Sequence, residues 1–319
     1  MMYDIIAIGE LLIDMTAQER KNDLRYIPNP GGAPANFLTI VQLMGGNTSF
    51  IGKVGKDYFG KILKECLVKH GVDTTNLIFD NKHPTTLAFV HLTEGESSFS
   101  FYRNQTADVM LTSKEVNFDI LNNTKAIYFG SLAFASSPLS KTVNKFIKKG
   151  KELEKVIFFD VNFRPNLWDN KQKALDLIKE KLSISDVVKL SEEELFLLAE
   201  DRNLDKALQI IKTWDIPLVF VTRGISSTIV LFKNKEFRVE TVKSTVVDTT
   251  GAGDAFFGVV AQKVLSQGCK LENIDEEIIK RATFLANLIA SMTITNHGGI
   301  PSYPSKETLE EIVRGHNLG

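Results

Sequence analysis

The sequence predicts an α/β protein whose mostly parallel central sheet is covered by helices. Short apolar runs rich in β-branched and aromatic residues recur at residues 5–8, 126–129, 156–159, 187–190 and 218–221. These runs are continuous rather than alternating, which is typical of strands buried on both faces. Between them, apolar residues recur at helical spacing in residues 146–153, 174–182 and 204–214. Repeated strand–helix–strand units imply right-handed crossovers, with ligands beyond the carboxyl ends of the strands.

Two segments do not fit this alternation. Residues 16–30 are polar and rich in turn formers, and residues 85–103 are predicted to form a hairpin with its turn at Glu94-Gly95-Glu96. The second arm of the hairpin alternates apolar and polar residues, which suits a half-exposed sheet. We expect both segments to form a small β-sheet that stands off the core. The alternative is an edge extension of the main sheet.

The composition of the 319-residue chain, with 43% hydrophobic and 24% charged residues, is typical of a soluble globular protein. A net charge of −1 gives no general electrostatic reason to expect nucleic acid or an acidic membrane as a partner. The lysines at residues 148–151 are expected to form a solvated helix end. No apolar run approaches the roughly 20 residues of a bilayer span, and the N-terminus lacks the features of a signal peptide. We therefore expect a cytoplasmic protein. Cys66 and Cys269 are expected to be reduced and structural, since free cysteine is usually buried.

The most informative segment is Asp248-Thr-Thr-Gly-Ala-Gly-Asp254. A β-rich run ends at Asp248, and an amphipathic helix is predicted to start near Ala252. Gly251 and Gly253 let another group approach the backbone, and the N–H groups of a first helical turn have no intrahelical partner. With the positive end of the helix dipole they form an anion site. Asp254 could serve that site or simply cap the helix, and an isolated Gly-x-Gly-Asp leaves both readings open.

Phosphoryl transfer is the reaction that such a site suits. It needs a positioned hydroxyl, an acceptor for the proton of that hydroxyl, and donors for the charge on the moving phosphoryl group. Asp254 is the predicted acceptor, and the helix dipole is expected to lower its pKa. The sequence has no Walker A loop, no protein-kinase motif and no HExxH, GxSxG or Cys/His pattern.

Polar residues near the N-terminus suit the binding of a polyol. Asp14 follows the first strand, where its carboxylate can accept hydrogen bonds from two hydroxyls, although it could also cap a turn. Gly32 permits close approach to the backbone, and Asn36 carries both a donor and an acceptor.

A second polar segment follows the buried run at residues 156–159. Asp160, Asn162 and Arg164 alternate, so in an extended segment they share one face. An acid, an amide and a guanidinium at the carboxyl end of a strand favour a binding site over a structural ion pair. Arg164 is the best candidate to clamp a phosphate or a sugar, because its planar fork suits bidentate contacts.

These segments resemble the ribokinase/PfkB carbohydrate kinases over nearly the whole chain. The resemblance rests on GELLID at residues 9–14, GGAPAN at 31–36, GKVGKD at 52–57 and DTTGAGDAFFG at 248–258. It implies one ribokinase-like α/β domain over residues 1–319, with a β-sheet lid inserted at about residues 14–31 and 84–108.

The resemblance also implies roles for individual residues. The sugar is expected against Asp14, Gly32 and Asn36, and the anion hole beside the catalytic Asp254 is expected from Gly251, Ala252 and Gly253. ATP is expected against Lys189, Ser191, Thr222, Gly224 and Asn287. Glu194 is expected to hold Mg²⁺ through water, and a monovalent cation such as K⁺ is expected near Asp248, Thr250, Gly298 and Ser302. The chain departs from the family pattern at two positions, with Ser191 in place of an Asn and Ser227 in place of a glycine.

The identity of the sugar depends on the hairpin. FYRNQTAD at residues 101–108 and DVNFRPNLW at residues 160–168 are similar to the fructokinase branch, which implies fructose 6-phosphate as product. The 2-keto-3-deoxygluconate kinases tend to carry a tyrosine where Phe101 stands. Arg103 is expected at the substrate and could hold the carboxylate of that sugar acid, so this kinase is the alternative, with a ribokinase behind it.

Readings of other classes are weaker. A non-catalytic sugar-sensing protein on the same fold is disfavoured by the intact GAGD run. A nicotinamide dehydrogenase would need GxGxxG after the first strand, where the chain has Gly9-Glu-Leu-Leu. The expected partners are therefore a small sugar and ATP, and an exposed lid sheet could pair two copies of the chain as a homodimer.

Overall fold

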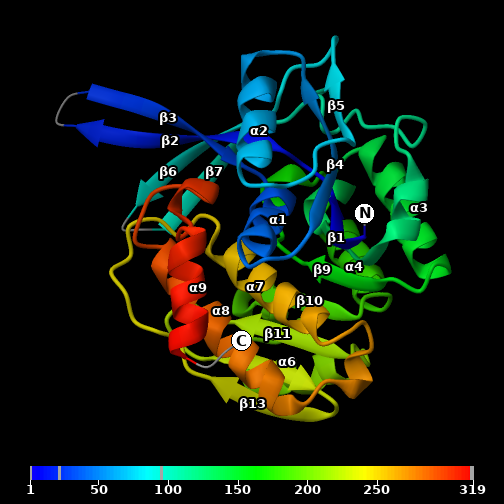
Figure 1. Ribbon diagram of the computed structural model, residues 1–319, viewed down its shortest axis with the longest axis vertical. Coiled ribbons are helices and arrows are strands. Elements are labelled where there is room, and N and C mark those ends of the chain that lie inside the picture. Colours follow the sequence, from blue (N-terminus) through cyan, green and yellow to red (C-terminus); the bar gives the residue numbers. More distant parts are fainter. Residues whose placement is uncertain (1, 21–22, 94–95, 317–319) are drawn as a thin grey trace.

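The structure is a computed structural model that describes residues 2–20, 23–93 and 96–316 (Figure 1). A 9-stranded sheet forms its centre. In spatial order its strands are β13 (Lys235–Val239), β12 (Thr228–Phe232), β11 (Leu218–Thr222), β10 (Val187–Ser191), β9 (Val156–Asp160), β8 (Thr124–Gly130), β1 (Tyr3–Ile8), β4 (Thr48–Gly55) and β5 (Leu77–Asp80). The strands from β11 to β5 are parallel, and β12 and β13 add an antiparallel edge. The predicted α/β class and all five predicted strands are confirmed.

Helices cover both faces of this sheet. Ile5 and Ala7 of β1 belong to one apolar core cluster and Ile6 and Ile8 belong to the other, as the alternation of side chains along a strand requires. The first cluster includes side chains of α1 (Ala33–Leu43), α2 (Tyr58–Lys69), α7 (Ala252–Ser266), α8 (Glu276–Thr293) and α9 (Lys306–Gly315). The second includes side chains of α3 (Leu139–Glu152), α4 (Lys171–Leu182), α5 (Glu192–Ala199) and α6 (Leu204–Lys212). The continuous apolar strand runs therefore reflect burial on both faces.

A separate 4-stranded sheet projects from the core at the upper left of Figure 1. Its strands, in spatial order, are β3 (Asp23–Gly31), β2 (Leu12–Arg20), β6 (Leu87–Thr93) and β7 (Glu96–Tyr102). The two segments that do not fit the strand–helix alternation thus form a sheet of their own, and the alternative of an edge extension of the main sheet is wrong. Of the predicted hairpin turn, Glu94 and Gly95 lie outside the described residues.

The predictions for the lysine cluster and for the cysteines have different outcomes. Lys149 and Lys151 lie in the last turn of α3, in agreement with a helix end. Both cysteines are free, but Cys269 is exposed and only Cys66 is partly buried, so a structural role for Cys269 is wrong. Within the described ranges, no helix combines the length and the apolar character that crossing a bilayer would require.

Candidate active site

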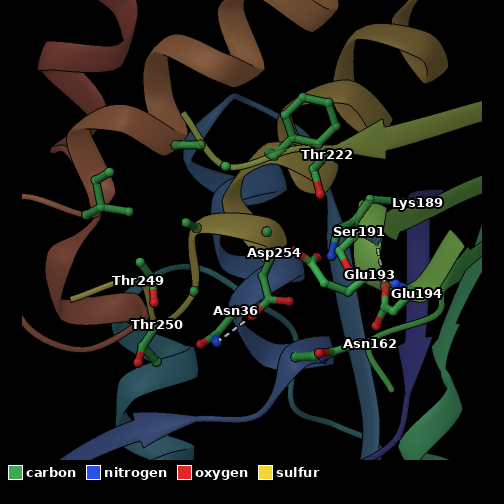
Figure 2. Close-up of a pocket in the computed structure, with 18 of the residues that line it drawn as sticks. Asn36, Asn162, Lys189, Ser191, Glu193, Glu194, Thr222, Thr249, Thr250 and Asp254 are labelled. Atoms are coloured by element: carbon green, nitrogen blue, oxygen red, sulfur yellow. Dashed lines mark hydrogen bonds between the residues drawn. The ribbon is translucent and has the colours of Figure 1, made fainter. Parts of the chain in front are cut away.

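A cavity of about 790 Å³ lies at the carboxyl ends of the parallel strands (Figure 2). It reaches from β7 of the small sheet to the ends of β10 and β11. Most residues singled out from the sequence line it: Asp14, Gly32, Asn36, Asn162, Arg164, Lys189, Ser191, Glu194, Thr222, Gly224, Thr250, Gly251, Ala252, Gly253, Asp254 and Asn287. The fold therefore brings together residues from the two ends of the chain.

Asp254 lies in the first turn of α7 and is buried. Asn36 of α1 donates a hydrogen bond of 2.8 Å from Nδ2 to Oδ2 of Asp254, and the two side chains point at each other in Figure 2. The helices can approach this closely because a Cβ at Gly258 would lie 2.0 Å from Cγ2 of Ile40. Gly251, which precedes the helix with φ 80°, is also required, since a Cβ there would meet Gly299 Cα at 2.7 Å.

Lys189 of β10 lies on the other side of this helix terminus. Its Nζ is 3.0 and 3.2 Å from the two carboxylate oxygens of Asp160, and a Cβ at Gly253 would meet it at 2.8 Å. Lys189 therefore places a positive charge directly beside the predicted anion hole.

Asp160 itself does not line the cavity, which corrects its predicted role as a sugar ligand. It is fully buried and forms an ion pair with Lys189, which does line the cavity. The predicted common face fails because Asn162 has a left-handed φ of 33°, so the segment is not extended there. Asn162 and Arg164 do reach the cavity, and the Arg164 guanidinium carbon is 5.4 Å from the centre of the Phe99 ring in β7.

Burial dominates the electrostatics of the carboxylates in this cavity. It raises the pKa of Asp254, although Lys189, the Asn36 hydrogen bond and Arg164 oppose the shift. The prediction that the helix dipole lowers this pKa is therefore wrong, because desolvation of the charged form outweighs it. Burial, followed by the charges of Asp254 and Asp248, raises the pKa of Asp14 to about 7. Both groups are thus stronger bases than an exposed aspartate.

Glu194 is held by the backbone at both oxygens. Oε2 accepts a hydrogen bond of 2.7 Å from Ser191 N, and Oε1 accepts one of 2.6 Å from Phe163 N. Ser191 completes a capping box at the start of α5, so the serine that departs from the family pattern acts as an N-cap. Among the described residues no cluster of three or more His, Cys, Asp or Glu side chains is arranged to hold a metal ion. The contact of Glu194 with Mg²⁺ through water stays a prediction, and each of its carboxylate oxygens keeps further acceptor capacity for such a water.

The far end of the cavity is built by β11, the turn after it and α8. Thr222 ends β11, and Gly224 has a positive φ of 55°. The Asn287 amide is already engaged: Oδ1 accepts from Thr228 Oγ1 at 2.8 Å, and Nδ2 donates to the carbonyls of Val239 and Glu240. Asn287 thus ties the segment after β13 to α8 at the wall of the cavity.

The predicted cation residues meet behind Gly251. Asp248 is fully buried, and its two oxygens accept hydrogen bonds from Thr250 N at 2.9 Å and Gly298 N at 2.8 Å. The Ser302 hydroxyl donates to the carbonyl of Gly299 at 2.7 Å. Thr250 lines the cavity, whereas Asp248, Gly298 and Ser302 lie behind its wall.

Arg103 does not line the cavity, which corrects its predicted contact with substrate. Its Nε is 2.7 Å from Asp108 Oδ2, and its Nη1 donates to the carbonyl of Leu132 at 3.1 Å. A buried carboxylate five residues away thus binds the guanidinium that the sequence alone left available.

Sequence reasoning did not assign a role to Glu10, although it belongs to the quoted GELLID motif. Glu10 follows β1 at the carboxyl edge of the sheet, is 2% exposed and lines the cavity. Its position directly after a buried strand was the available signal. Phe99 and Phe101 of β7 and Leu132 complete the wall at this end.

Known proteins are similar to this chain in sequence and architecture. Residues 2–306 match the pfkB family carbohydrate kinase. The chain is 35% identical over 97% of its length to "Probable fructokinase-6, chloroplastic" of Arabidopsis thaliana, of which 82% is covered. Fructokinase with bound ATP from Xylella fastidiosa superposes with a TM-score of 0.88 at 28% identity, covering 98% of this chain and 99% of that chain.

Fructokinase from Vibrio cholerae O395 is similarly close. Its fructose, ADP and calcium ion bound form superposes with a TM-score of 0.86 at 28% identity, covering 97% of this chain and 98% of that chain. A double mutant of the same enzyme, in a fructose, ADP and potassium ion bound form, superposes with a TM-score of 0.87 at 28% identity over the same shares of the two chains. With the family match over nearly the whole chain, the predicted resemblance is confirmed: this protein belongs to the pfkB family of carbohydrate kinases and is a sugar kinase with a ribokinase-like fold.

Proposed function

We propose that the protein transfers the γ-phosphoryl group of MgATP to the primary 6-hydroxyl of D-fructose and releases fructose 6-phosphate and ADP. The observation that carries this proposal is the Asn36–Asp254 pair at the head of α7, in the middle of one continuous cavity. Predicted sugar residues line one end of this cavity and predicted nucleotide residues line the other.

Asp254 is the general base in this proposal. Its buried carboxylate accepts the hydroxyl proton, the hydroxyl oxygen forms a bond to the γ-phosphorus, and the bond from that phosphorus to the bridging oxygen of ADP breaks. The raised pKa of Asp254 favours proton acceptance, and Asn36 orients the carboxylate. The N–H groups of Gly251, Ala252 and Gly253 stabilise the charge on the transferred group, as the dipole of α7 also does.

The nucleotide lies against Lys189, Ser191, Thr222 and Gly224, and Asn287 shapes the wall beside it. Mg²⁺ associated with Glu194 through water would neutralise charge on the phosphate oxygens. The loops that contain Asp248, Thr250, Gly298 and Ser302 bind K⁺. This assignment is supported by their convergence behind Gly251 and by a buried carboxylate, a ligand type that suits a hard cation.

Fructose fits the sugar end of the cavity. The relatives named fructokinase support this choice, as do the apolar rings of Phe99 and Phe101, which supply no hydroxyl or charge at the wall. Asp14, Gly32, Asn36, Asn162 and Arg164 contact the sugar. The small sheet acts as a lid on a single domain over residues 1–319, and its exposed Leu24, Ile27 and Tyr102 support pairing with a second copy.

The test is a coupled assay of ADP release with fructose, 2-keto-3-deoxygluconate, ribose and adenosine at equal concentrations. We expect the highest kcat/KM with fructose and, by ³¹P NMR, a phosphate ester at C6. A higher kcat/KM with any of the other three compounds would replace fructose as the substrate. Absence of ADP release with all sugars would contradict the kinase assignment itself.

A further inference from the structure

Glu10 gives the sugar end of the cavity a carboxylate that the phosphoryl-transfer chemistry does not require. It extends from the loop after β1, and its Oε1 accepts a weak hydrogen bond of 3.3 Å from Ala33 N. Its Oε2 is buried without a hydrogen-bond partner among the described residues. Buried polar atoms are nearly always paired, so this oxygen is available to a hydroxyl donor of a bound molecule.

Arg103, which the sequence predicted at the substrate, forms an ion pair with Asp108. Asp108 holds its Nε at 2.7 Å, and the side chains of the pair are 3% and 1% exposed. The hydroxyls of Thr86 and Thr106 both donate to the other oxygen of Asp108, Thr106 at 2.8 Å. The ion pair and the Leu132 carbonyl therefore hold Nε and Nη1 of Arg103 in place, whereas its Nη2 is buried without a hydrogen-bond partner among the described residues. Burial raises the pKa of Glu10, the charge of Arg103 opposes this rise, and the charge of Asp108 adds to it.

Most of the charged side chains that face the sugar end are acidic. Glu10, Asp14 and Asp254 line it, whereas Lys189 is paired with Asp160. Arg164 also lines the cavity. It forms no ion pair with any described residue, and its guanidinium lies over the Phe99 ring.

We infer that Glu10, together with the Asp108 carboxylate that neutralises the charge of Arg103, makes this site select uncharged sugars against sugar acids. This inference rests on the proposed function in one respect, namely that the cavity binds the phosphoryl acceptor. A neutral ketose can donate hydroxyl hydrogen bonds to Glu10 and Asp14. A substrate carboxylate in the same place would meet like charges in a low-dielectric cavity, an arrangement that discriminates against it without any added contact to the favoured sugar.

The decisive experiment compares wild type with Glu10→Gln and with Glu10→Gln/Asp108→Asn. For each we would measure kcat/KM, and calorimetric Kd without nucleotide, for fructose and 2-keto-3-deoxygluconate. The measurements are made at about pH 8, above the pKa of about 7 of Glu10 and Asp14. We expect the ratio of kcat/KM for fructose to kcat/KM for the sugar acid to fall about tenfold or more in Glu10→Gln, and further in the double variant, where Asp108 no longer neutralises the charge of Arg103. Glutamine keeps the shape and the acceptor, so loss of charge is the only intended change.

Asp80→Asn serves as the matched control. Asp80 is a buried carboxylate paired with Lys53, and it does not line the cavity. This variant should leave the ratio between the two sugars unchanged. If the double variant does not fold, Glu10→Gln alone carries the test, because Glu10 has no ion-pair partner among the described residues.

The outcomes separate this inference from the proposed function. An unchanged ratio in Glu10→Gln, with fructose still phosphorylated by wild type, overturns the inference and leaves the function standing. Preference of wild type for another neutral sugar, with sugar acids rejected, overturns fructose and supports the inference. If wild type binds or phosphorylates 2-keto-3-deoxygluconate better than every neutral sugar, the inference is overturned. If no sugar reacts with wild type, the calorimetric data decide. The inference then requires that the ratio of the Kd for the sugar acid to the Kd for fructose falls in Glu10→Gln, and an unchanged ratio overturns it.

Discussion

Two regions of the molecule bury carboxylates, and they treat them in opposite ways. In the cavity, burial raises the pKa of Glu10 and of Asp14 to about 7 each. In a cluster at the ends of β4 and β5, Lys53 lies 2.9 Å from Asp80 and 2.8 Å from Glu115. Burial would raise the pKa of Asp80 there as well, but hydrogen bonds from Lys53, from the backbone and from His83 lower it below its usual range.

The difference shows which charges serve structure and which serve chemistry. In the β4–β5 cluster (Lys53, Asp80 and Glu115), both acids form an ion pair with Lys53, so the ionised form is the stable one. In the cavity, Glu10 and Asp14 form no ion pair with any described residue, and their ionised forms are destabilised until a ligand supplies donors. Perturbed, unbalanced carboxylates of this kind are typical of functional sites, where a protein gives up stability for reactivity.

The largest expected effect comes from Asp254→Asn. This change removes the proton acceptor but keeps the size of the side chain, so kcat should fall by on the order of 10²–10⁴ while the Kd for sugar changes far less. Steady-state kinetics with calorimetric Kd values would measure both.

The same substitution in the other cluster, Asp80→Asn, is the control for burial of a neutral amide. It should lower stability and leave kcat per folded molecule unchanged. Near-normal turnover in Asp254→Asn would rule out Asp254 as the base, and a comparable loss of kcat in Asp80→Asn would remove the distinction between the two regions.

Next in size is the effect of Lys53→Met on stability. Removing the cation leaves two carboxylates close together, one of them almost fully buried, which should cost about 3 kcal/mol in the free energy of unfolding. Urea denaturation would measure this, with activity of the folded fraction unchanged.

Lys189→Met offers the contrasting case. It should lower kcat as well as stability, because Lys189 lies beside Asp254 and the anion hole. If Lys53→Met has the same free energy of unfolding as wild type, the ion pairs of the β4–β5 cluster do not stabilise the fold.

The sequence predicts the strands and the lining of the cavity far better than the pairing and conformation of individual residues around it. Strand runs, the glycines before α7 and the positions of Asp14 and Asn36 follow from local pattern, because strand ends in a parallel sheet meet at one edge. The pairing of Arg103 with Asp108 and the left-handed backbone of Asn162 do not follow from local pattern, because both depend on tertiary contacts that sequence spacing does not specify. The direction of the Asp254 pKa shift also depends on burial, which a helix-dipole argument does not contain.

A smaller effect is expected in the dependence of stability on pH. The pKa of Asp14 is raised from 3.8 to about 7 in the folded protein, so between these values the unfolded chain releases a proton that the folded chain keeps. Stability from this group is full below pH 3.8 and is lost as pH rises through about 7. The melting temperature of Asp14→Asn should therefore exceed that of wild type by a few degrees at about pH 8 and by little at about pH 4.

Asp80→Asn should behave in the opposite sense. The pKa of Asp80 is lowered on folding, so the stability it supplies is present above its unfolded pKa and is lost as pH falls through the folded value. Its melting temperature should fall below that of wild type at neutral pH, and the gap should close in acid. If the difference in melting temperature from wild type changes with pH in the same direction for both variants, the two regions do not differ in this way.

The smallest effect concerns the proposed K⁺ site, which would add positive charge to the acid-rich region. Asp248 is one of the charges that raise the pKa of Asp14, after burial and Asp254, so a cation beside Asp248 would reduce the excess of negative charge near the sugar. We expect kcat/KM for fructose to rise by a factor of about ten or less when K⁺ replaces tetramethylammonium at matched ionic strength. Asp248→Asn should lose this dependence, and Asp80→Asn should keep it. Equal rates in both salts would mean that the loops behind Gly251 stabilise the anion hole by their own hydrogen bonds, from Thr250 and Gly298 to Asp248, without a cation.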